Sequence, residues 1–527
     1  MKVVKKTESI CPVCRAKIPA TVYEESGKVY IAKTCPDHGE FNEVYWDSFS
    51  EYERAARYKN YFSSKESECP YDCGICTNHR STPMIGIIDV TNRCNLRCPI
   101  CFAHAGAAGY VYEPTLDQIE SMMRNLIDTK PFSTPCLQLS GGEPTVRDDL
   151  PEIIRVAKEM GFILVMVNSN GIRMAESLDY CRALKEADLD NVYLQFDGVT
   201  PEPYIQARGV NLLSVKLKAI ENLKEAGLAS TVLVPTLVKG VNDDQIGDII
   251  RFAIDNNDCV RGVNFQPVSI TGRINASERE KMRITIPELT RLAEEQTGGF
   301  IKQRDWYPIP AVQPLTQLIS HVKNRYYPDF NAHPHCGAAT YLVVDGDEVH
   351  PITEYMDVDR LIESLESYNK GQRDGHDLKT KVDLAKTLLK GVEFGGLFKM
   401  IRDIVYDNDF QHVFDIHREM ILLSTMHFQD PYNFDVDRVQ RCVVHYATPD
   451  DRVIPFCAMN NIHREEVERK FAIDIDQELT EKVPQFTEEN LRKIPSMATS
   501  NLNVERLIRL NHPWVHSTYQ MQKTARE

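Results

Sequence analysis

The sequence predicts an α/β protein built on a partial barrel of six β/α units, with a small metal-binding module before it and an α+β segment after it. Between residues 84 and 273, six short apolar runs alternate with segments of helical periodicity. Cysteines cluster before this region at the spacing of metal ligands, and the pattern after it is mixed. The length of 527 residues allows several domains. We divide the chain into residues 1–60, 61–82, 83–285, 286–475 and 476–527.

Composition narrows the class of protein. Hydrophobic residues make up 42% and charged residues 26%, which is ordinary for a globular chain. The formal net charge of -15 argues against nucleic acid as the main partner, because a phosphate-binding face needs a basic excess. No apolar run reaches the roughly 18 residues of a membrane span, and the first residues lack the apolar stretch of a signal peptide. We expect a cytoplasmic protein, and docking on a membrane surface stays open.

The first segment, residues 1–60, has the pattern of a metal-stapled module. "CPVC" contains Cys11 and Cys14, and "CPDH" contains Cys35 and His38, after a gap of twenty residues. Such spacing is typical of a zinc ribbon or a rubredoxin-like knuckle, where the metal supplies folding energy that a tiny core cannot. Free thiols are the weaker alternative. Both mononuclear iron and zinc accept this ligand set, so the sequence leaves the metal open.

The barrel is predicted from its alternating pattern. The apolar runs are "IGIIDV", "CLQLS", "FILVMV", "VYLQF", "TVLVPTLV" and "GVNFQPV". Helical periodicity separates them, as in "TLDQIESMMRNLI", where Thr115 and Gln118 form a capping box. Strands that alternate with helices pair in parallel through right-handed crossovers. Catalytic groups of such barrels lie on the loops that follow the strands.

One cysteine spacing, C-x3-C-x2-C, occurs twice, in Cys69, Cys73 and Cys76 and again in Cys94, Cys98 and Cys101. The first triplet follows a polar stretch, "SSKESE". The second directly follows the apolar strand from Ile85 to Val90, at the carboxyl end of the first barrel strand. Because active sites lie at that end of a barrel, we expect the second triplet to carry the chemistry.

Three closely spaced thiolates can hold three corners of a 4Fe-4S cluster and leave one iron without a protein ligand. That iron can chelate the amino and carboxylate groups of S-adenosylmethionine (SAM), and an electron then splits the sulfonium to give a 5′-deoxyadenosyl radical. A zinc site or an electron-carrying ferredoxin is the alternative. The bacterial ferredoxin spacing, C-x2-C-x2-C-x3-C, differs from the one seen here.

At these residues the sequence resembles the radical SAM superfamily, whose hallmark C-x3-C-x-Φ-C is met with Ile100 at Φ. The resemblance implies a partial (β/α)6 TIM-like radical SAM barrel. "LSGGEPT" resembles the family's glycine motif after the second strand, which implies that Gly141, Gly142 and Glu143 hold the methionyl amino group. Glycine suits this place because backbone must approach the ligand closely.

Further cofactor-binding residues are implied by the same resemblance. "NSNG" ends the third strand and "QFDG" the fourth, and similar family positions touch the ribose and methionyl groups, which here are Ser169, Asn170, Gln195 and Asp197. Polar capping of strand-to-helix turns is the alternative for each. Arg208 is expected either to pair with the SAM carboxylate or to be a solvated surface arginine.

The remaining cysteines divide into two sets. Cys136, Cys181 and Cys259 are isolated in core-patterned segments and are expected to be small buried hydrophobes. Cys336, Cys442 and Cys457 flank tight turns or hairpin ends, and with the first triplet they offer thiolates for two auxiliary clusters. Candidate fourth ligands are His79, His104, His335 and His445, although a lone histidine near cysteines is more often a neighbour.

The segment after the barrel mixes elements. We expect a long helical stretch at about residues 361–426, a β-hairpin with Cys442 and Cys457 at its two ends, and a polar peripheral tail in residues 476–527. The helical stretch contains enough Leu, Ile, Phe and Met to line an apolar tunnel, but the sequence alone favours an ordinary helical core.

The ordered set of motifs over residues 8–475 resembles the archaeal tetraether lipid synthase group. These enzymes join terminal methyl carbons of isoprenoid chains of archaeol-type ether lipids and use two SAM molecules per bond. The resemblance implies three 4Fe-4S clusters, a mononuclear metal site, an electron donor such as ferredoxin or flavodoxin, and a peripheral membrane contact.

Two alternatives remain. Members of the same group have also been described as radical SAM methyltransferases acting on 7,8-dihydro-6-hydroxymethylpterin. A lipid substrate predicts an apolar tunnel, whereas a pterin calls for a small polar pocket. A non-catalytic iron–sulfur electron carrier is the third hypothesis, and it would leave "LSGGEP" and "QFDG" without a use.

Overall fold

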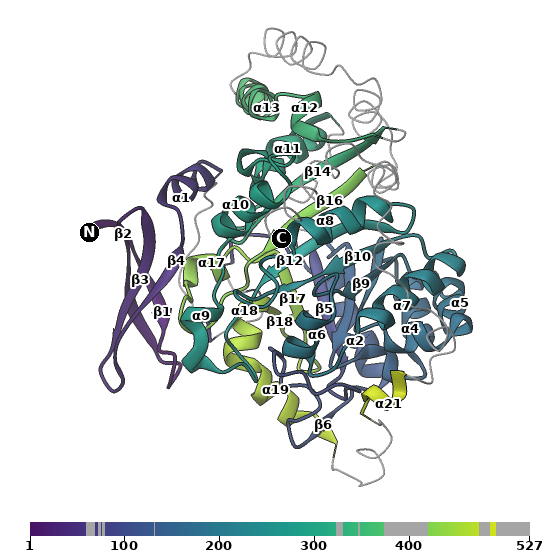
Figure 1. Ribbon diagram of the computed structural model, residues 1–527. Coiled ribbons are helices and arrows are strands. Elements are labelled where there is room, and N and C mark those ends of the chain that lie inside the picture. The colour runs from purple at the N-terminus through teal and green to yellow at the C-terminus, as the bar shows by residue number, and fades with distance from the viewer. Residues whose placement is uncertain are drawn as a thin grey trace, which may run out of the picture.

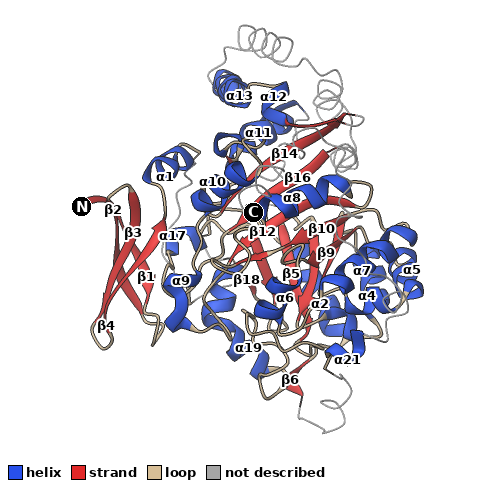
Figure 2. Ribbon diagram, in the orientation of Figure 1, coloured by secondary structure: helices blue, strands red, loops and turns tan. Residues whose placement is uncertain are grey.

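The computed structural model of the chain is drawn in Figure 1. It describes residues 1–58, 69–71, 75, 79–130, 132–322, 330–345, 348–373, 420–473 and 485–491. A four-stranded antiparallel sheet at the N-terminus stands beside the main body, which is built around one large sheet (Figures 1 and 2). No helix within the described ranges is long and apolar enough to cross a membrane.

The N-terminal sheet is a pair of hairpins. Its strands are β1 (Lys2–Ile10), β2 (Lys17–Glu25), β3 (Lys28–Cys35) and β4 (Gly39–Trp46), followed by helix α1 (Phe49–Ala56). Alternate residues such as Val22, Val29 and Ile31 are buried, as expected for strands with one face on a core. The β1–β2 and β3–β4 turns bring the four predicted metal ligands to one end of the sheet.

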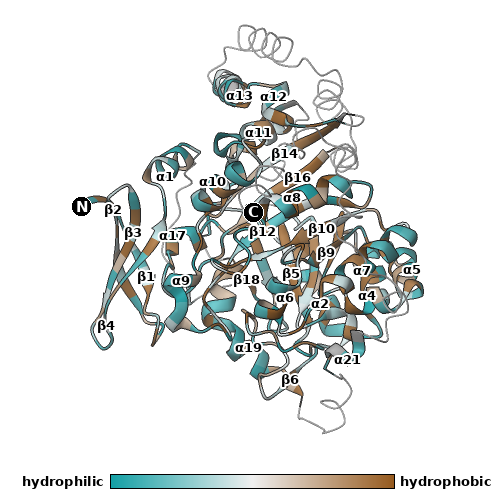
Figure 3. Cartoon of the chain, in the orientation of Figure 1, coloured by the Kyte–Doolittle hydropathy of each residue, from teal (hydrophilic) through white to brown (hydrophobic). Residues whose placement is uncertain are grey.

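The predicted barrel is confirmed. Its strands are β5 (Ile85–Thr91), β7 (Cys136–Gly141), β8 (Leu164–Ser169), β9 (Asn191–Gln195), β10 (Thr231–Val234) and β12 (Val260–Pro267), all parallel to their neighbours. The longer crossover helices are α2 (Leu116–Ile127), α3 (Leu150–Glu159), α5 (Leu178–Glu186), α7 (Leu213–Glu225) and α8 (Ile246–Asp255). Hydrophobic residues concentrate on the strands, and polar residues on the outer faces of the helices (Figure 3). Such strands are buried on both faces, which explains their continuous apolar runs.

Helix α2 illustrates how local sequence sets an element. The Thr115 side chain accepts from the Gln118 amide, and the Gln118 side chain accepts from the Thr115 amide, so the predicted capping box is present. The face that packs on the barrel buries Ile119, Met123 and Leu126.

The smaller elements around the barrel are β6 (Val111–Tyr112), α4 (Ile172–Glu176), α6 (Pro201–Arg208), β11 (Thr236–Leu237), α9 (Arg279–Met282) and α10 (Ile286–Gln296).

Strands from the C-terminal segment extend the barrel sheet at both edges. At one edge lie β16 (Met420–Met426), β14 (Gly337–Asp345), β15 (Glu348–Pro351) and β13 (Tyr307–Pro308). At the other lie β17 (Val444–Ala447) and β18 (Val453–Pro455), the hairpin predicted between Cys442 and Cys457. Among the described strands the order runs from β13 to β18 without closing, so the barrel is partial. The segments predicted as 83–285 and 286–475 therefore share one sheet.

The prediction of a helix through residue 426 is wrong at its end. Helix α13 (Val358–Arg373) forms its beginning, and residues 374–419 lie outside the described ranges. Met420–Met426 is strand β16, parallel to β12 and antiparallel to β14. A seven-residue apolar run does not distinguish a buried strand from a buried helix, and here two neighbouring strands decide. The other C-terminal elements are α11 (Gln313–Val322), α12 (Ile352–Tyr355), α17 (Val436–Val439), α18 (Phe456–Ala458), α19 (Arg464–Lys470), β19 (Ala472–Ile473) and α21 (Glu488–Leu491).

Part of the segment expected to be a peripheral tail packs on the barrel. The Gln485 side chain donates to the Cys94 carbonyl at 3.0 Å, and the Phe486 amide donates to the Asn95 carbonyl at 2.8 Å. Of residues 476–527, the structure describes 485–491, and the others lie outside the described ranges. The tail thus reaches the second cysteine triplet at one point.

Candidate functional site

The N-terminal sheet brings four ligand atoms together. The Cys14 and Cys35 sulfurs are 3.9 Å apart, and His38 Nδ1 lies 3.5 Å from the Cys35 sulfur and 3.7 Å from the Cys11 sulfur. A tetrahedral ion with metal–sulfur bonds of about 2.3 Å has ligand atoms roughly 3.5–3.8 Å apart. The four atoms therefore fit one mononuclear ion. Burial opposes ionisation of Cys11, but the Cys14 and Val13 amides lower the pKa of its thiol to about 7, which favours metal binding.

Cys94, Cys98 and Cys101 lie in the loop after β5, and all three line the same large cavity. Burial raises the pKa of the Cys94 and Cys98 thiols, while Arg208 acts in the opposite direction at Cys98. Three thiols on one loop, facing a cavity, suit a 4Fe-4S cluster with one open corner. When bound, that cluster supplies the electron that cleaves SAM.

The glycine motif brings the end of β7 against this loop. Gly141 has a φ of +130°, and a Cβ there would overlap the Thr91 carbonyl. A Cβ on Gly142 would overlap the Arg93 carbonyl. Only glycine lets the two backbones approach so closely. Both glycines line the cavity beside the cysteines.

Glu143 joins the ends of two neighbouring strands. Its carboxylate accepts from the Ser169 hydroxyl at 2.8 Å and from the Asn170 amide at 2.7 Å, and also from Thr145 at 2.6 Å. Burial raises the pKa of Glu143, although these donors act against the rise. Glu143, Ser169 and Asn170 all line the cavity. The structure therefore assembles three residues that the sequence assigned to SAM binding.

The remaining predicted cofactor residues bind one another. Arg208 makes a two-pronged ion pair with the fully buried Asp197, at 2.7 and 2.8 Å, and donates to the Ile100 carbonyl in the cysteine loop at 3.0 Å. The Gln195 side chain donates to Asp197. The alternative of a solvated surface arginine is wrong, because Arg208 is buried. Its contact with the SAM carboxylate stays a prediction.

Lys216 on α7 is a residue that sequence reasoning missed. Its ammonium group donates to the Gln195 side chain at 2.6 Å and to the Asn170 carbonyl. Burial lowers its pKa to about 7. Lys216 lies three residues after Leu213 and four before Ile220, both of them buried on α7. This interruption of an apolar stripe by a lysine was the available signal.

Cys336, Cys442 and Cys457 lie near one another, with Cys457 buried and the other two half-buried. Burial raises the pKa of the Cys442 thiol, and nearby Cys457 and Cys336 add to the effect. Arg438 lies beside Cys336 and Cys457. Cys69 is buried, whereas Cys73 and Cys76 lie outside the described ranges. The two auxiliary clusters therefore stay predictions.

The candidate histidines have other contacts. The Nε2 atoms of His79 and His445 lie 3.1 Å apart, and His79 Nε2 lies 3.0 Å from the Cys442 carbonyl oxygen. His335 stacks on Tyr52 with a centroid distance of 3.9 Å, and His104 is exposed. The isolated cysteines Cys181 and Cys259 are fully buried, as predicted, while Cys136 is half-buried and lines the cavity.

The cavity has a volume of about 1200 Å³ and runs from the cysteine loop through the barrel interior. Near the strand ends its wall is polar, with Glu143, Asn168, Gln195 and Asn264. Its other end lies among α11, α13, β14 and β16 and is lined by apolar side chains, including Leu315, Leu318, Leu361, Leu365 and Met420. One continuous space thus joins a polar compartment to an apolar one.

Comparisons with known proteins agree with this arrangement. The family model of the radical SAM superfamily matches residues 88–253, and that of the HMPTM N-terminal zinc ribbon domain matches residues 3–47. A relative from Methanocaldococcus jannaschii, named 7,8-dihydro-6-hydroxymethylpterin dimethyltransferase, is 47% identical over 490 residues. The match covers 90% of this chain and 96% of the relative. The chain belongs to the same radical SAM family as this relative.

Other relatives and solved structures match less of the chain. The GTP 3′,8-cyclase of Listeria monocytogenes is 32% identical over 197 residues, covering 37% of this chain and 56% of the relative. The crystal structure of Streptococcus suis SuiB bound to S-adenosylmethionine superposes with a TM-score of 0.34 and 18% identity, covering 42% of this chain and 48% of SuiB. The resemblance to radical SAM proteins is confirmed, and the family implies a 4Fe-4S cluster and SAM. The name of the M. jannaschii relative agrees with the methyltransferase alternative better than with lipid coupling.

Proposed function

We propose that this radical SAM enzyme couples isoprenoid chains of archaeol-type ether lipids by forming carbon–carbon bonds between saturated carbons. The observation that carries the proposal is the apolar end of the 1200 Å³ cavity, which is continuous with the cysteine loop. This volume also has to hold the cluster and SAM, so the apolar wall of the far end, rather than the size of the cavity, distinguishes the two substrates. A bicyclic pterin would leave the apolar compartment among α11 and α13 empty, whereas a hydrocarbon chain would fill it.

The polar and apolar compartments would hold different molecules, SAM and the hydrocarbon chain. Glu143, Gln195 and the glycine motif would hold SAM at the polar end, where the family's chemistry supplies a 5′-deoxyadenosyl radical. Leu315, Leu318 and Leu365 would hold the chain and exclude water, which protects a carbon radical from side reactions. Each new bond removes one hydrogen atom from each of two carbons, and each hydrogen leaves as the methyl hydrogen of a 5′-deoxyadenosine. Two SAM molecules are therefore consumed per bond.

Methylation of 7,8-dihydro-6-hydroxymethylpterin is the second candidate, favoured by the name of the 47% identical relative. Gln138, Asn168 and Asn264 line the barrel interior and offer amide groups that a pterin ring could use. The remaining hypothesis, an electron carrier, gives no role to Glu143 and Gln195 in the cavity wall. For the reductant we propose ferredoxin or flavodoxin, and we propose that the enzyme reaches its lipid from the membrane surface.

The test is a product analysis. The protein is reconstituted anaerobically with iron and sulfide, reduced, and given SAM with either archaeol phospholipid or the reduced pterin. Coupled chains lighter by two hydrogens per bond, with two 5′-deoxyadenosines per bond, would support lipid coupling. A methylated pterin with unchanged lipid would assign the methyltransferase function. Full activity of Cys98→Ala on either substrate would contradict both.

A further inference from the structure

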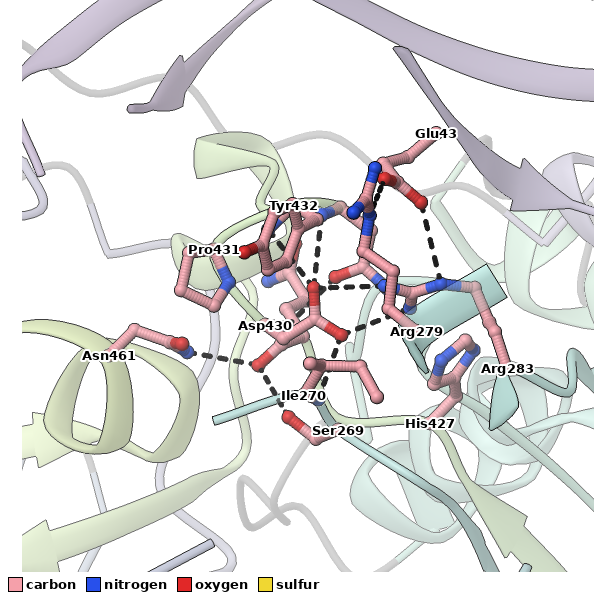
Figure 4. A network of polar contacts seen from close by, with 12 residues as sticks. Glu43, Ser269, Ile270, Arg279, Arg283, His427, Asp430, Pro431, Tyr432 and Asn461 are labelled. Atoms are coloured by element: carbon pink, nitrogen blue, oxygen red, sulfur yellow. Dashed lines mark hydrogen bonds and ion pairs between the residues drawn. The ribbon is translucent and has the colours of Figure 1, made fainter. Parts of the chain in front are cut away.

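We propose that Asp430, in the loop between β16 and α17, is a positioning residue for the radical SAM cysteine loop. It acts through the segment 269–273, which follows β12, and the N-terminal metal-binding sheet braces it from the opposite side. The inference concerns cluster and cofactor geometry and is independent of which substrate the enzyme takes. Figure 4 shows Asp430 at the centre of the contacts, with side chains from three parts of the chain around it.

Asp430 is fully buried and has a partner for each oxygen. Oδ2 accepts from the Ile270 amide at 3.0 Å, and Oδ1 accepts from the Tyr432 amide at 3.0 Å. Arg283 donates to Oδ1 at 3.2 Å, and its other terminal nitrogen forms an ion pair with Oδ2 at 3.0 Å. Burial alone would raise the pKa of Asp430, but Arg283 and the Ile270 amide outweigh it, and the pKa lies below its ordinary value. The carboxylate therefore stays charged and fixes the backbone at Ile270.

Three residues beyond Ile270, Arg273 holds the cysteine loop. Its amide donates to the Cys101 carbonyl at 2.9 Å, and its guanidinium donates to the Cys98 carbonyl at 3.0 Å and to the Ala105 carbonyl. Gly272, with a φ of +65°, brings the two backbones so close that a Cβ would overlap the Cys101 and Phe102 carbonyls. One arginine thus ties down three carbonyls of the loop that carries the cluster thiols.

Gln429, the residue before Asp430, contacts Cys457, one of the cysteines predicted to hold an auxiliary cluster. The Gln429 amide donates to the Cys457 sulfur at 3.3 Å, and its carbonyl accepts from Ser269 at 3.1 Å and from Asn461 at 2.9 Å. Asp430 and Gln429 consequently connect segment 269–273 with both the radical SAM cysteines and Cys457. A common support of this kind would fix the distance between the two sulfur sites.

The N-terminal sheet completes the junction with buried charges. Glu43 on β4 pairs with Arg279 and lies 3.8 Å from Arg283, which also binds Asp430. Lys33 on β3 donates to the Pro431 carbonyl at 2.6 Å. Replacing buried ion pairs by apolar groups is often neutral or stabilising, so such a network is weak as a source of stability. Its use here is geometric, since an active-site constellation must be held within about 0.5 Å.

The test compares Asp430→Asn with Asp435→Asn, a matched control five residues away. Asp435 is equally buried and binds Lys5 at 2.7 Å and Tyr45 at 2.9 Å, so it ties the N-terminal sheet to the same loop. Among the described residues its carboxylate bonds to Lys5, Thr7, Tyr45 and the Asp437 amide, and none of these belongs to segment 269–273. Both variants are studied as reconstituted holoenzymes by hydrogen exchange, by electron paramagnetic resonance of the reduced cluster with SAM, and by SAM dissociation constant.

We expect Asp430→Asn to speed amide exchange in residues 98–106 and 269–273, to broaden the SAM-dependent resonance, and to weaken SAM binding about tenfold or more. Asp435→Asn should leave all three at wild-type values. Wild-type behaviour of Asp430→Asn, or equal changes in both variants, would overturn the proposal. Should Asp430→Asn fail to fold, Arg273→Lys tests the same connection with the junction intact. Wild-type exchange and resonance in Arg273→Lys would overturn the proposal as well.

Discussion

Lys216 illustrates how a single buried side chain organises the cofactor motifs. Gln195 and Asn170 come from neighbouring strand ends, and the Lys216 ammonium group bonds to both. Gln195 bonds to Asp197, which holds Arg208, which reaches the Ile100 carbonyl in the cysteine loop. Losing the lysine would leave buried acceptors without a donor, which costs about 1–3 kcal/mol for each group.

We therefore expect Lys216→Met to weaken SAM binding by about tenfold while the cluster is still incorporated. Lys218→Met is the control, because Lys218 is on the same helix and pairs with Glu221 at the surface at 2.9 Å. Equilibrium dialysis with SAM measures the dissociation constant, and iron analysis measures cluster content. Equal affinity in the two variants would contradict the role assigned to Lys216.

The same lysine predicts a dependence of stability on pH. Its pKa is about 7 in the folded protein, below the ordinary value of 10.5, because burial disfavours the charged form. The unfolded chain binds more protons between these values, so the burial penalty is present in full below pH 7 and is relieved as the pH rises toward 10.5.

The melting temperature of the wild type minus that of Lys216→Met should therefore rise from about pH 7 to about pH 10. Lys33, whose burial likewise lowers its pKa, to about 8, is present in both proteins, and its contribution cancels in the difference. Thermal denaturation followed by circular dichroism measures both curves. A difference that is constant over this range would show that Lys216 is not the group that titrates.

Among the elements, the N-terminal sheet depends most on a metal. Its own core around the ligands is small, with Ile18 and Phe41 packed against Cys11 and Cys35. Short hairpins of this size rarely fold without a staple, and a bound ion supplies the missing free energy. Further support comes from Val22, Val29 and Ile31, which are buried in the main core, and from the junction with the loop at Asp430 and Asp435.

His38→Ala should lose the mononuclear metal and speed amide exchange in residues 2–46, with the barrel strands unaffected. The expected loss follows from removing one of four ligands that converge on a single point. Metal analysis and hydrogen exchange measure the two effects. His350→Ala is the control, since His350 is a surface residue beside Glu354 and Glu348; metal retained by His38→Ala would rule out the four-ligand site.

Over the whole molecule, the extension of the sheet decides the shape of the cavity. Strands β14 and β16 and helices α11 and α13 add an apolar compartment to the barrel, which by itself ends in polar strand-end loops. If this compartment holds the substrate chain, filling it should separate radical formation from product formation.

Leu365→Trp places a bulky ring in the apolar compartment and should reduce lipid coupling at least about tenfold, because a well-packed site accommodates added volume poorly. Cleavage of SAM in the absence of substrate should be unchanged, since the polar end is untouched. Ser367→Trp, on the exposed face of the same helix, is the control. Product analysis by mass spectrometry measures both quantities, and equal coupling by the two variants would place the chain elsewhere.

Local sequence determined the elements and the order of the motifs. The period of apolar residues predicted six parallel strands and their helices. Thr115 and Gln118 predicted the start of α2, and the paired cysteine and histidine ligands predicted the four-atom metal site. The sequence could predict these features because each signal depends on residues close together in the chain. Only the tertiary structure decided which segments far apart in the sequence come into contact. Strand β16 exists because β12 and β14 flank it, and Lys216 serves the cofactor motifs because the barrel brings α7 beside two strand ends. Asp430 reaches Ile270 and Arg283 for the same reason, since residues more than a hundred positions apart meet only when the chain is folded.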